Sequence, residues 1–95
     1  MRWWLTLAWT LLISETATRQ LKKLDRSTAQ TLLRSLSRLL QEVEDPRRRG
    51  KPLPANLAGL WRYRVGDCRM ICRIEAERLV LLVLQIGHRR EVDRS

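Results

Sequence analysis

The segment Leu60–Ile74 constrains the fold more than any other part of the chain, because two alternating runs flank a tight turn. Apolar and arginine side chains alternate through Leu60–Val65 and again through Cys68–Ile74. Gly66 and Asp67 alone separate the two runs. A two-residue connection with glycine first is typical of a type II′ β-hairpin. The segment therefore predicts an antiparallel hairpin with a fixed register.

The predicted hairpin has two chemically different faces. Counting from the turn, its cross-strand pairs are Val65 with Cys68, Arg64 with Arg69, Tyr63 with Met70, and Trp61 with Cys72. One face is apolar and is expected to meet the core: Trp61, Tyr63, Val65, Cys68, Met70, Cys72 and Ile74. The opposite face holds Leu60, Ile71 and four arginines, Arg62, Arg64, Arg69 and Arg73.

The arginine face is unfavourable by itself. Like charges directly opposite each other on paired strands are destabilising, and Arg64 faces Arg69 in the predicted register. The arginine stems could lie over the sheet on a solvated surface. Alternatively, the face binds an anion, and the convergence of four arginines on one hairpin favours this second interpretation.

Composition narrows the class of partner. The 95 residues allow one domain, 1–95, with a modest core. The formal net charge is +9, and sixteen of the 19 basic residues are arginine. Guanidinium groups bind phosphate bidentately, although composition alone leaves nucleic acid, an anionic membrane and an acidic protein as possible partners. A single histidine and two cysteines are too few for a structural zinc site, so we expect no metal and no cofactor.

The two cysteines are predicted to be reduced and buried. Cys68 and Cys72 lie four residues apart on one face of one strand, which separates their Cα atoms by about 13 Å. That distance is too long for a disulfide. Free thiols are usual in a cytoplasmic protein, so we expect a cytoplasmic location.

The N-terminal half predicts a strand followed by two helices. The apolar run Trp3–Ile13 is too short to span a membrane, and no signal cleavage site follows it. We expect a strand at Ala8–Ile13, preceded by an atypical lead-in at residues 1–7. Ser14 is a favourable N-cap for the first helix. The second helix is expected to be capped by Ser27 or Thr28, to end near Val43, and to pack against the first as an antiparallel helical hairpin.

The C-terminal half supplies the remaining strands. The basic loop Arg47–Lys51 is either a solvated connector or a contact to a nucleic-acid backbone. Arg78–Ile86 is expected to form a central strand covered on both sides and to end at Gly87, before a polar tail at residues 88–95. The element order is then β-α-α-β-β-β. This order predicts an α+β fold with a largely antiparallel sheet, the helices on one face and the arginines on the other.

The residues favour phosphate binding over an obvious proton-transfer mechanism. The chain has no local motif for a nucleophilic Ser or Cys, paired carboxylates, a phosphate-binding glycine loop or metal ligands. Arginine stays protonated and is a poor proton shuttle. Clustered arginines can nevertheless bind phosphate and stabilise the added charge of a pentacovalent phosphorus.

The chain resembles the RelE side of the RelE/ParE toxin superfamily over about Ala8–Val92. The resemblance is carried by ETATRQLKKLD, EDPRRRGKPL, LAGLWRYRVGDCRMICRI and LVLLVLQIGHRREV. It implies a compact fold like that of microbial ribonucleases. It also implies a ribosome-dependent endoribonuclease that cuts mRNA in the A site by metal-independent attack of the ribose 2′-hydroxyl. Implied partners are mRNA, the ribosome and a RelB-like antitoxin, with operator DNA bound only through the antitoxin complex and no membrane partner.

The resemblance assigns roles to particular residues. By motif, Arg62, Arg64, Arg69 and Arg89 match the catalytic positions, where they would hold the scissile phosphate and stabilise its charge. We assign RNA phosphate binding to Lys51, Arg73 and Arg90, of which Arg73 is not a family catalytic position. His88 and Asp93 are possible auxiliary residues.

One departure from the family pattern leaves alternatives open. The family's terminal motif reads GHRREVY, whereas this chain reads GHRREVD, with Asp93 in place of the expected tyrosine. Asp93 cannot stack on a base, although it could serve as a proton acceptor or pair with Arg89 or Arg90. The alternatives are therefore a catalytically weakened module that binds antitoxin, or a ParE-type toxin that poisons a type II topoisomerase.

Overall fold

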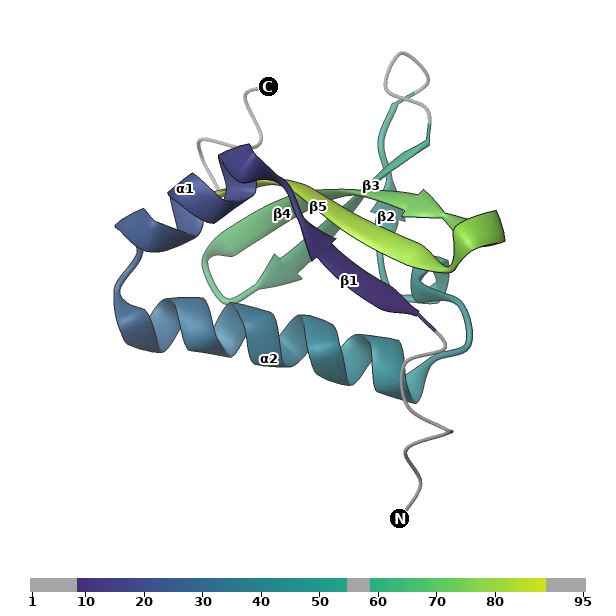
Figure 1. The fold of residues 1–95 in the computed structure, drawn as a ribbon, viewed down its shortest axis with the longest axis horizontal. Helices are drawn as coiled ribbons and strands as arrows, with labels where there is room; N and C mark the ends of the chain where they lie inside the picture. The colour runs from purple at the N-terminus through teal and green to yellow at the C-terminus, as the bar shows by residue number, and fades with distance from the viewer. Residues whose placement is uncertain (1–8, 55–58, 89–95) are drawn as a thin grey trace.

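A five-stranded sheet with two helices on one face forms the fold, and the computed structural model describes residues 9–54 and 59–88 of it (Figure 1). The strand order is β1-β5-β4-β3-β2; β1 is parallel to β5, and the other neighbours are antiparallel. This arrangement confirms the predicted α+β fold. The elements are β1 (Thr10–Ile13), α1 (Glu15–Lys23), α2 (Arg26–Glu42), a 3-10 turn (Pro46–Arg48), β2 (Lys51–Pro52), β3 (Leu60–Val65), β4 (Cys68–Glu75), a second 3-10 turn (Ala76–Arg78) and β5 (Val80–His88).

The β3–β4 hairpin has the predicted register. Val65 pairs with Cys68, Arg64 with Arg69, Tyr63 with Met70, and Trp61 with Cys72. Gly66 has a φ of 59°, whereas Asp67 stays out of the positive-φ region. Positive φ at the first central residue alone is the type II′ pattern, so the predicted turn type is confirmed.

The two helices begin at different kinds of cap. Ser14 Oγ accepts a hydrogen bond from the Ala17 backbone N–H at 3.0 Å, as predicted. The second helix is capped by Asp25, so the prediction of Ser27 or Thr28 was wrong. Asp25 Oδ2 accepts from the Thr28 N–H at 3.1 Å, and Oδ1 accepts from the Thr28 hydroxyl at 2.6 Å. The Asp25 carboxylate satisfies the Thr28 N–H, and its negative charge is favourable at the positive end of the helix.

Strand β5 differs from the prediction at both ends. It begins at Val80 rather than Arg78, because Ala76–Arg78 form a 3-10 turn and Leu79 adopts a left-handed φ of 55°. It also continues through Gly87, which pairs with Arg69. Strand β5 continues past Gly87 because β4 extends alongside it and supplies hydrogen-bond partners. Glycine keeps the backbone donor and acceptor that this pairing uses.

Strand β1 also begins later than predicted, because Trp9 has another role. Trp9 is 4% exposed, and its indole Nε1 donates to the Glu44 carbonyl oxygen at 2.8 Å. This contact ties the entry to β1 to the chain that leaves α2. Residues 1–7 and Ala8 of the predicted lead-in and strand lie outside the described residues.

The core lies between the two helices and one face of the sheet. Helix α1 contributes Ala17, and α2 contributes Leu32, Leu36, Leu39 and Leu40. Strand β5 adds the fully buried Leu81 and Val83, while Leu82 and Leu84 on its other face stay half-buried. The expectation that this strand is covered on both sides was therefore wrong, since both helices pack on one face. No helix in the described ranges is long and apolar enough to cross a membrane.

Both cysteines are free and buried, as predicted. Cys72 belongs to the core, and burial raises the pKa of its thiol to about 12. Burial also raises the pKa of the Cys68 thiol. Both thiols are protonated and unreactive at neutral pH, because the thiolate is the reactive form.

Candidate functional site

A cavity of about 270 Å³ opens on the sheet face opposite the helices. Every described residue that lines it carries a cationic side chain, and these residues come from three segments: Arg49 and Lys51, Arg62 and Arg64 on β3, and Arg69 on β4. Alternation along the strands explains why these arginines lie on the face away from the helices: their neighbours Tyr63 and Met70 point the other way and are buried in the core. The register adds cross-strand proximity, because Lys51 pairs with Arg62 and Arg64 pairs with Arg69. We call this hollow, with its five cationic lining residues, the basic cavity.

Arg69 occupies the deepest place in the basic cavity. It is 8% exposed, whereas Arg49, Lys51 and Arg64 are exposed and Arg62 is half-buried. Its backbone partner on β5 is Gly87, which has no side chain. A buried charge is costly unless other groups compensate it. Arg69 therefore marks the point at which a bound anion would be most strongly shielded from water.

The electrostatics of the basic cavity favour an anionic ligand. Five positive groups converge on one small volume, and no carboxylate of the described residues lines it. Asp45, which precedes the basic loop, is held by Arg47 through a 2.7 Å ion pair. Hydrogen bonds from Arg47 lower the pKa of the Asp45 carboxyl. An anion with several oxygen acceptors would relieve the repulsion among the five cations and match the guanidinium geometry.

The basic loop is anchored to the core by an aromatic side chain. Tyr63 is buried, and its hydroxyl donates to the Pro46 carbonyl oxygen at 2.6 Å. Burial raises the pKa of the Tyr63 phenol, so the hydroxyl stays a donor through the physiological range. Gly50 packs on the same ring: an added Cβ would lie 2.8 Å from Tyr63 Cζ. These contacts fix the segment that presents Arg49 and Lys51 to the basic cavity.

The structure brings together four of the residues predicted for the site. Arg62, Arg64, Arg69 and Lys51 line the basic cavity. Arg73 lies on the same sheet face, but it pairs with Leu60 and Leu82 and does not line the basic cavity. His88 ends β5 opposite Cys68. Its side chain, and the whole of Arg89, Arg90 and Asp93, lie outside the described residues.

Arg49 was not among the predicted site residues. The run Arg47–Lys51 signalled positive charge, but nothing in it distinguished one arginine from another. The fold distinguishes Arg49 from Arg47, because Arg47 turns back to form an ion pair with Asp45 while Gly50 packs against Tyr63 beside Arg49. In the described ranges, no group of three or more His, Cys, Asp or Glu residues is placed to hold a metal ion.

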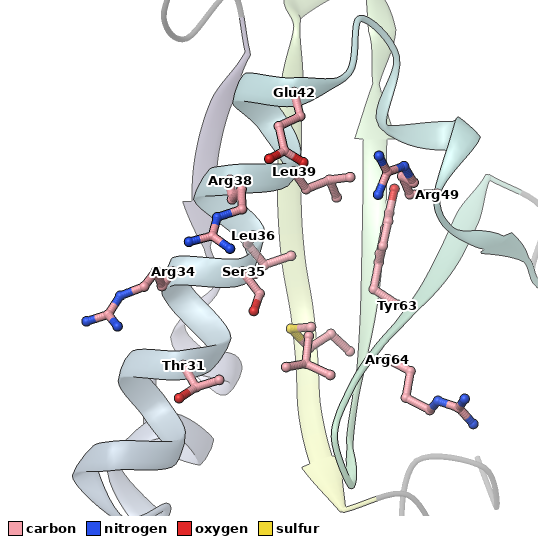
Figure 2. Close-up of a pocket in the computed structure, with 12 residues that line it drawn as sticks. Thr31, Arg34, Ser35, Leu36, Arg38, Leu39, Glu42, Arg49, Tyr63 and Arg64 are labelled. Atoms are coloured by element: carbon pink, nitrogen blue, oxygen red, sulfur yellow. The ribbon is translucent and has the colours of Figure 1, made fainter.

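A second hollow lies on the other side of β3 and is larger, at about 610 Å³ (Figure 2). It runs between α2 and the β3–β4 hairpin. We call it the α2 groove. Its lining residues are Thr31, Arg34, Ser35, Leu36, Arg38, Leu39, Glu42, Arg49, Tyr63, Arg64, Val65 and Met70.

Chemically, the basic cavity can grip a phosphate and stabilise charge that builds on it. It lacks a described carboxylate or imidazole in its lining that could move a proton. Arginine does not fill that role, because it stays protonated. Proton transfer at this site would require groups from outside this described lining.

Comparison with known proteins places the chain in a family of toxins from toxin–antitoxin systems. The family described as "ParE toxin of type II toxin-antitoxin system, parDE" matches residues 11–93. Toxin RelG of Mycobacterium tuberculosis is 38% identical over 50 residues, which is 53% of this chain and 58% of that protein. The matched stretch thus spans a little over half of that relative's length.

Solved structures extend the similarity to nearly the whole fold. The RelBE2 toxin–antitoxin complex of Mycobacterium tuberculosis contains a chain 33% identical to this one, with a TM-score of 0.75 over 85% of this chain and 98% of that chain. The Escherichia coli RelBE complex contains a chain 19% identical to this one, with a TM-score of 0.67 over 85% of this chain and 96% of that chain. The Pyrococcus horikoshii RelE–RelB complex contains a chain 20% identical to this one, with a TM-score of 0.65 over 85% of this chain and 94% of that chain. The last two similarities show the fold.

Proposed function

This chain belongs to the RelE/ParE family of type II toxin–antitoxin toxins, and we propose that it is an mRNA interferase, a ribosome-dependent endoribonuclease that cuts mRNA in the A site. The basic cavity is the observation that carries the proposal. It concentrates five cations on one sheet face, four of which match residues assigned to RNA from the sequence. The arginine-rich composition is suited to phosphate recognition.

The proposed reaction is an internal transesterification. The ribose 2′-oxygen attacks the adjacent phosphorus, the bond from phosphorus to the 5′-oxygen breaks, and the products carry a 2′,3′-cyclic phosphate and a 5′-hydroxyl. The 2′-hydroxyl loses a proton to a base, and the departing 5′-oxygen gains one. Arg62, Arg64 and Arg69 would hold the phosphate and stabilise the pentacovalent state, with Arg89 joining them from beyond β5. Fixed positive donors of this kind act most strongly where charge develops.

Proton transfer is the part of this reaction that the arginines do not supply. His88 and Asp93 are the candidates near the end of β5, and Asp93 occupies the position of the family's tyrosine. Groups of the ribosome or of the mRNA itself are the other source. The proposed dependence on the ribosome would supply acid–base groups that the described lining of the basic cavity lacks.

The proposed partners follow the same reasoning. A RelB-like antitoxin would neutralise the toxin, as toxin and antitoxin form the complexes of the structural relatives. Lys51, Arg73 and Arg90 would add contacts to RNA phosphates. The site of action would be the cytoplasm, where ribosomes and mRNA meet, and operator DNA would be reached only through the antitoxin complex.

A primer-extension assay on mRNA in a reconstituted translation reaction tests the proposal. We expect new 5′ ends within codons in the A site when the chain is added with translating ribosomes, and none without ribosomes. An mRNA with one 2′-deoxyribose at the main cleavage site should lose that cut and keep the others. Cuts that persist at the deoxy position would rule out attack by the 2′-hydroxyl.

A ParE-type activity is the second candidate, because the matching family is described by the parDE system. In this alternative the chain poisons a type II topoisomerase through protein contact. DNA cleavage complexes trapped with purified gyrase, together with uncut mRNA in the translation assay, would favour it. Silence in both assays would favour a catalytically weakened module that binds antitoxin.

A further inference from the structure

Strand β5 contains one residue more than the part of β4 that lies opposite it. Cys72 pairs with Val83, and Ile71 pairs with Gln85. The register between the two strands therefore skips Leu84. One unmatched residue of this kind is a β-bulge, which bends a strand and re-aims the side chains that follow it. The bulge at Leu84 thus decides which later residues of β5 lie on the side of the basic cavity.

The bulge reverses the alternation of buried and outward-facing side chains along β5. Val83, before the bulge, is fully buried in the core, and Ile86, after it, is 3% exposed. Because these two core residues are three positions apart, Gln85 and Gly87 lie on the other face, where Gly87 pairs with Arg69. Without the bulge, strict alternation from Val83 would place Gly87 on the core face. The bulge therefore brings the end of β5 to the basic cavity in the phase that faces Arg69.

Helix α1 and its N-cap hold the outer edge of β5 at the bulge (Figure 1). Strand β1 pairs with β5 as far as Val83. There the Ser14 N–H donates to the Val83 carbonyl oxygen at 2.9 Å, and the Ser14 hydroxyl donates to the Leu84 carbonyl oxygen at 3.0 Å. Further along, Gln20 Oε1 accepts a hydrogen bond from the Ile86 N–H at 2.5 Å. These bonds satisfy backbone groups on both sides of the bulge.

Gln20 is the residue that acts on the bulge from within the helix. Ser14 also caps α1, because its hydroxyl oxygen accepts from the Ala17 N–H, so its loss would disturb the helix as well. Gln20 lies inside α1 and is half-buried, and its bond reaches a residue 66 positions away. A half-buried amide needs such a partner, since burying an unpaired polar group is costly. A change at Gln20 therefore tests the bulge with little effect on the helix cap.

We infer that Gln20 is a positioning residue for the basic cavity: it fixes the bulge at Leu84, so that the chain leaving β5 delivers Arg89 to the side of Arg69. The inference rests on the proposed function, in which Arg89 joins the cavity arginines. Alternation from Gly87 assigns position 89 to the same face. A bulge without its bond to Gln20 is free to shift, and a shift of one residue moves every later side chain to the opposite face. Gln20 would act through Arg89, since it does not itself line the basic cavity.

A double-mutant cycle on the full chain tests this inference. Gln20→Met keeps a side chain of similar length but removes the acceptor, whereas Gln20→Glu keeps an acceptor. Thr18→Val is the matched control, because the Thr18 hydroxyl donates to the Ser14 carbonyl oxygen and not to β5. Each change is made in the wild-type chain and in Arg89→Ala. Fluorescence anisotropy measures the affinity for a labelled 2′-O-methyl RNA oligonucleotide, which cannot be cut at the 2′-oxygen.

The expected effects depend on the background. In the wild-type chain, Gln20→Met should weaken oligonucleotide binding roughly fivefold, whereas Gln20→Glu and Thr18→Val should bind like the wild type. In Arg89→Ala, Gln20→Met should have little further effect, because the residue through which it acts is already absent. Amide hydrogen exchange followed by NMR should be faster at Ile86 in Gln20→Met than in Thr18→Val. A merely structural role would weaken binding equally in both backgrounds.

Four results would each overturn the inference: equal weakening by Gln20→Met in both backgrounds, unchanged binding in Arg89→Ala, unchanged exchange at Ile86 in Gln20→Met, or the same loss of affinity in Gln20→Glu. None of these results depends on RNA cleavage. Coupling between Gln20 and Arg89 without cuts in the translation assay would leave the positioning role intact and remove the nuclease proposal. Cuts that disappear in Arg89→Ala, without coupling to Gln20, would do the reverse.

Discussion

The hydroxyl of Tyr63 donates a buried hydrogen bond of 2.6 Å to the carbonyl oxygen of Pro46, 17 positions earlier in the chain. The bond joins the core face of β3 to the turn that precedes the basic loop. Because Arg62 and Arg64 flank Tyr63 on β3, one side chain holds the loop against the strand that carries two cavity arginines. The geometry of the basic cavity thus depends on a residue that points away from it.

Removing the Tyr63 hydroxyl should lower the stability of the fold. In Tyr63→Phe the ring still fills the core, but the Pro46 carbonyl loses its buried donor. We expect the free energy of unfolding to fall by about 1–3 kcal/mol, as for other buried groups left without a partner. Urea denaturation measures this loss. Unchanged stability would mean that water replaces the hydroxyl without cost.

A side chain at position 50 should disturb the same contact from the other side. In Gly50→Ala the new Cβ would lie 2.8 Å from Tyr63 Cζ, closer than packed carbon atoms approach. Since the ring is held by its hydrogen bond, we expect a loss of about 1–3 kcal/mol from overpacking. Gly50→Ala combined with Tyr63→Leu should cost less than the sum of the single changes. Strict additivity in the denaturation data would contradict the contact.

Stability should fall in alkaline solution because of the buried thiols. Burial raises the folded-state pKa of Cys72 from 9.0 to about 12. Above pH 9 the unfolded chain therefore loses this proton while the folded chain keeps it, so rising pH favours unfolding. Each such group lowers stability by about 1.4 kcal/mol per pH unit in that window. Cys68 and Tyr63, whose pKa values are also raised, act in the same direction.

Denaturation at several pH values checks this prediction against a matched variant. Cys72→Ala should be less stable at neutral pH, because it leaves a core cavity. Its stability should nevertheless decline less steeply above pH 9 than that of the wild-type chain. Parallel declines in the two proteins would assign the alkaline loss to other groups.

RNA binding should depend on salt in proportion to the cations in the basic cavity. For single strands, the logarithm of affinity falls with the logarithm of salt by about 0.7 per neutralised phosphate. Arg62→Ala should therefore reduce this slope by about 0.7, measured with a labelled 2′-O-methyl RNA oligonucleotide that cannot be cut at the 2′-oxygen. Arg19→Ala is the control, because Arg19 is exposed on α1 and pairs with Glu15. Equal slopes in the wild-type chain and both variants would show that Arg62 does not contact an RNA phosphate.

The sequence was most informative where local pattern and tertiary structure agree. The β3–β4 register could be predicted because alternation and the Gly66–Asp67 turn specify the same pairing. The first helix and its Ser14 cap, the buried reduced cysteines and the α+β class were predictable for similar local reasons. The resemblance to RelE toxins assigned Arg62, Arg64 and Arg69 to the site, and the fold places them around one cavity.

Features that depend on distant contacts were not predictable. Strand β2 has two residues, Lys51 and Pro52, so it carries no periodic signal, and it exists because β3 offers an edge. The role of Arg49 depends on how Gly50 meets Tyr63. The extension of β5 past Gly87 depends on its partner strand β4. In each case a residue far along the chain supplies the physical reason.

Primer extension with cavity variants directly tests whether the basic cavity cuts mRNA on the ribosome. The wild-type chain and Arg19→Ala should produce the same cuts in reconstituted translation. Arg62→Ala and Arg64→Ala should cut roughly a hundredfold more slowly, as expected when one charge-stabilising donor is lost, with circular dichroism confirming their folds. Asp93→Tyr should cut at least as fast as the wild-type chain. Full activity in both cavity variants, or no cuts from the wild-type chain and Asp93→Tyr alike, would contradict mRNA cleavage by the basic cavity.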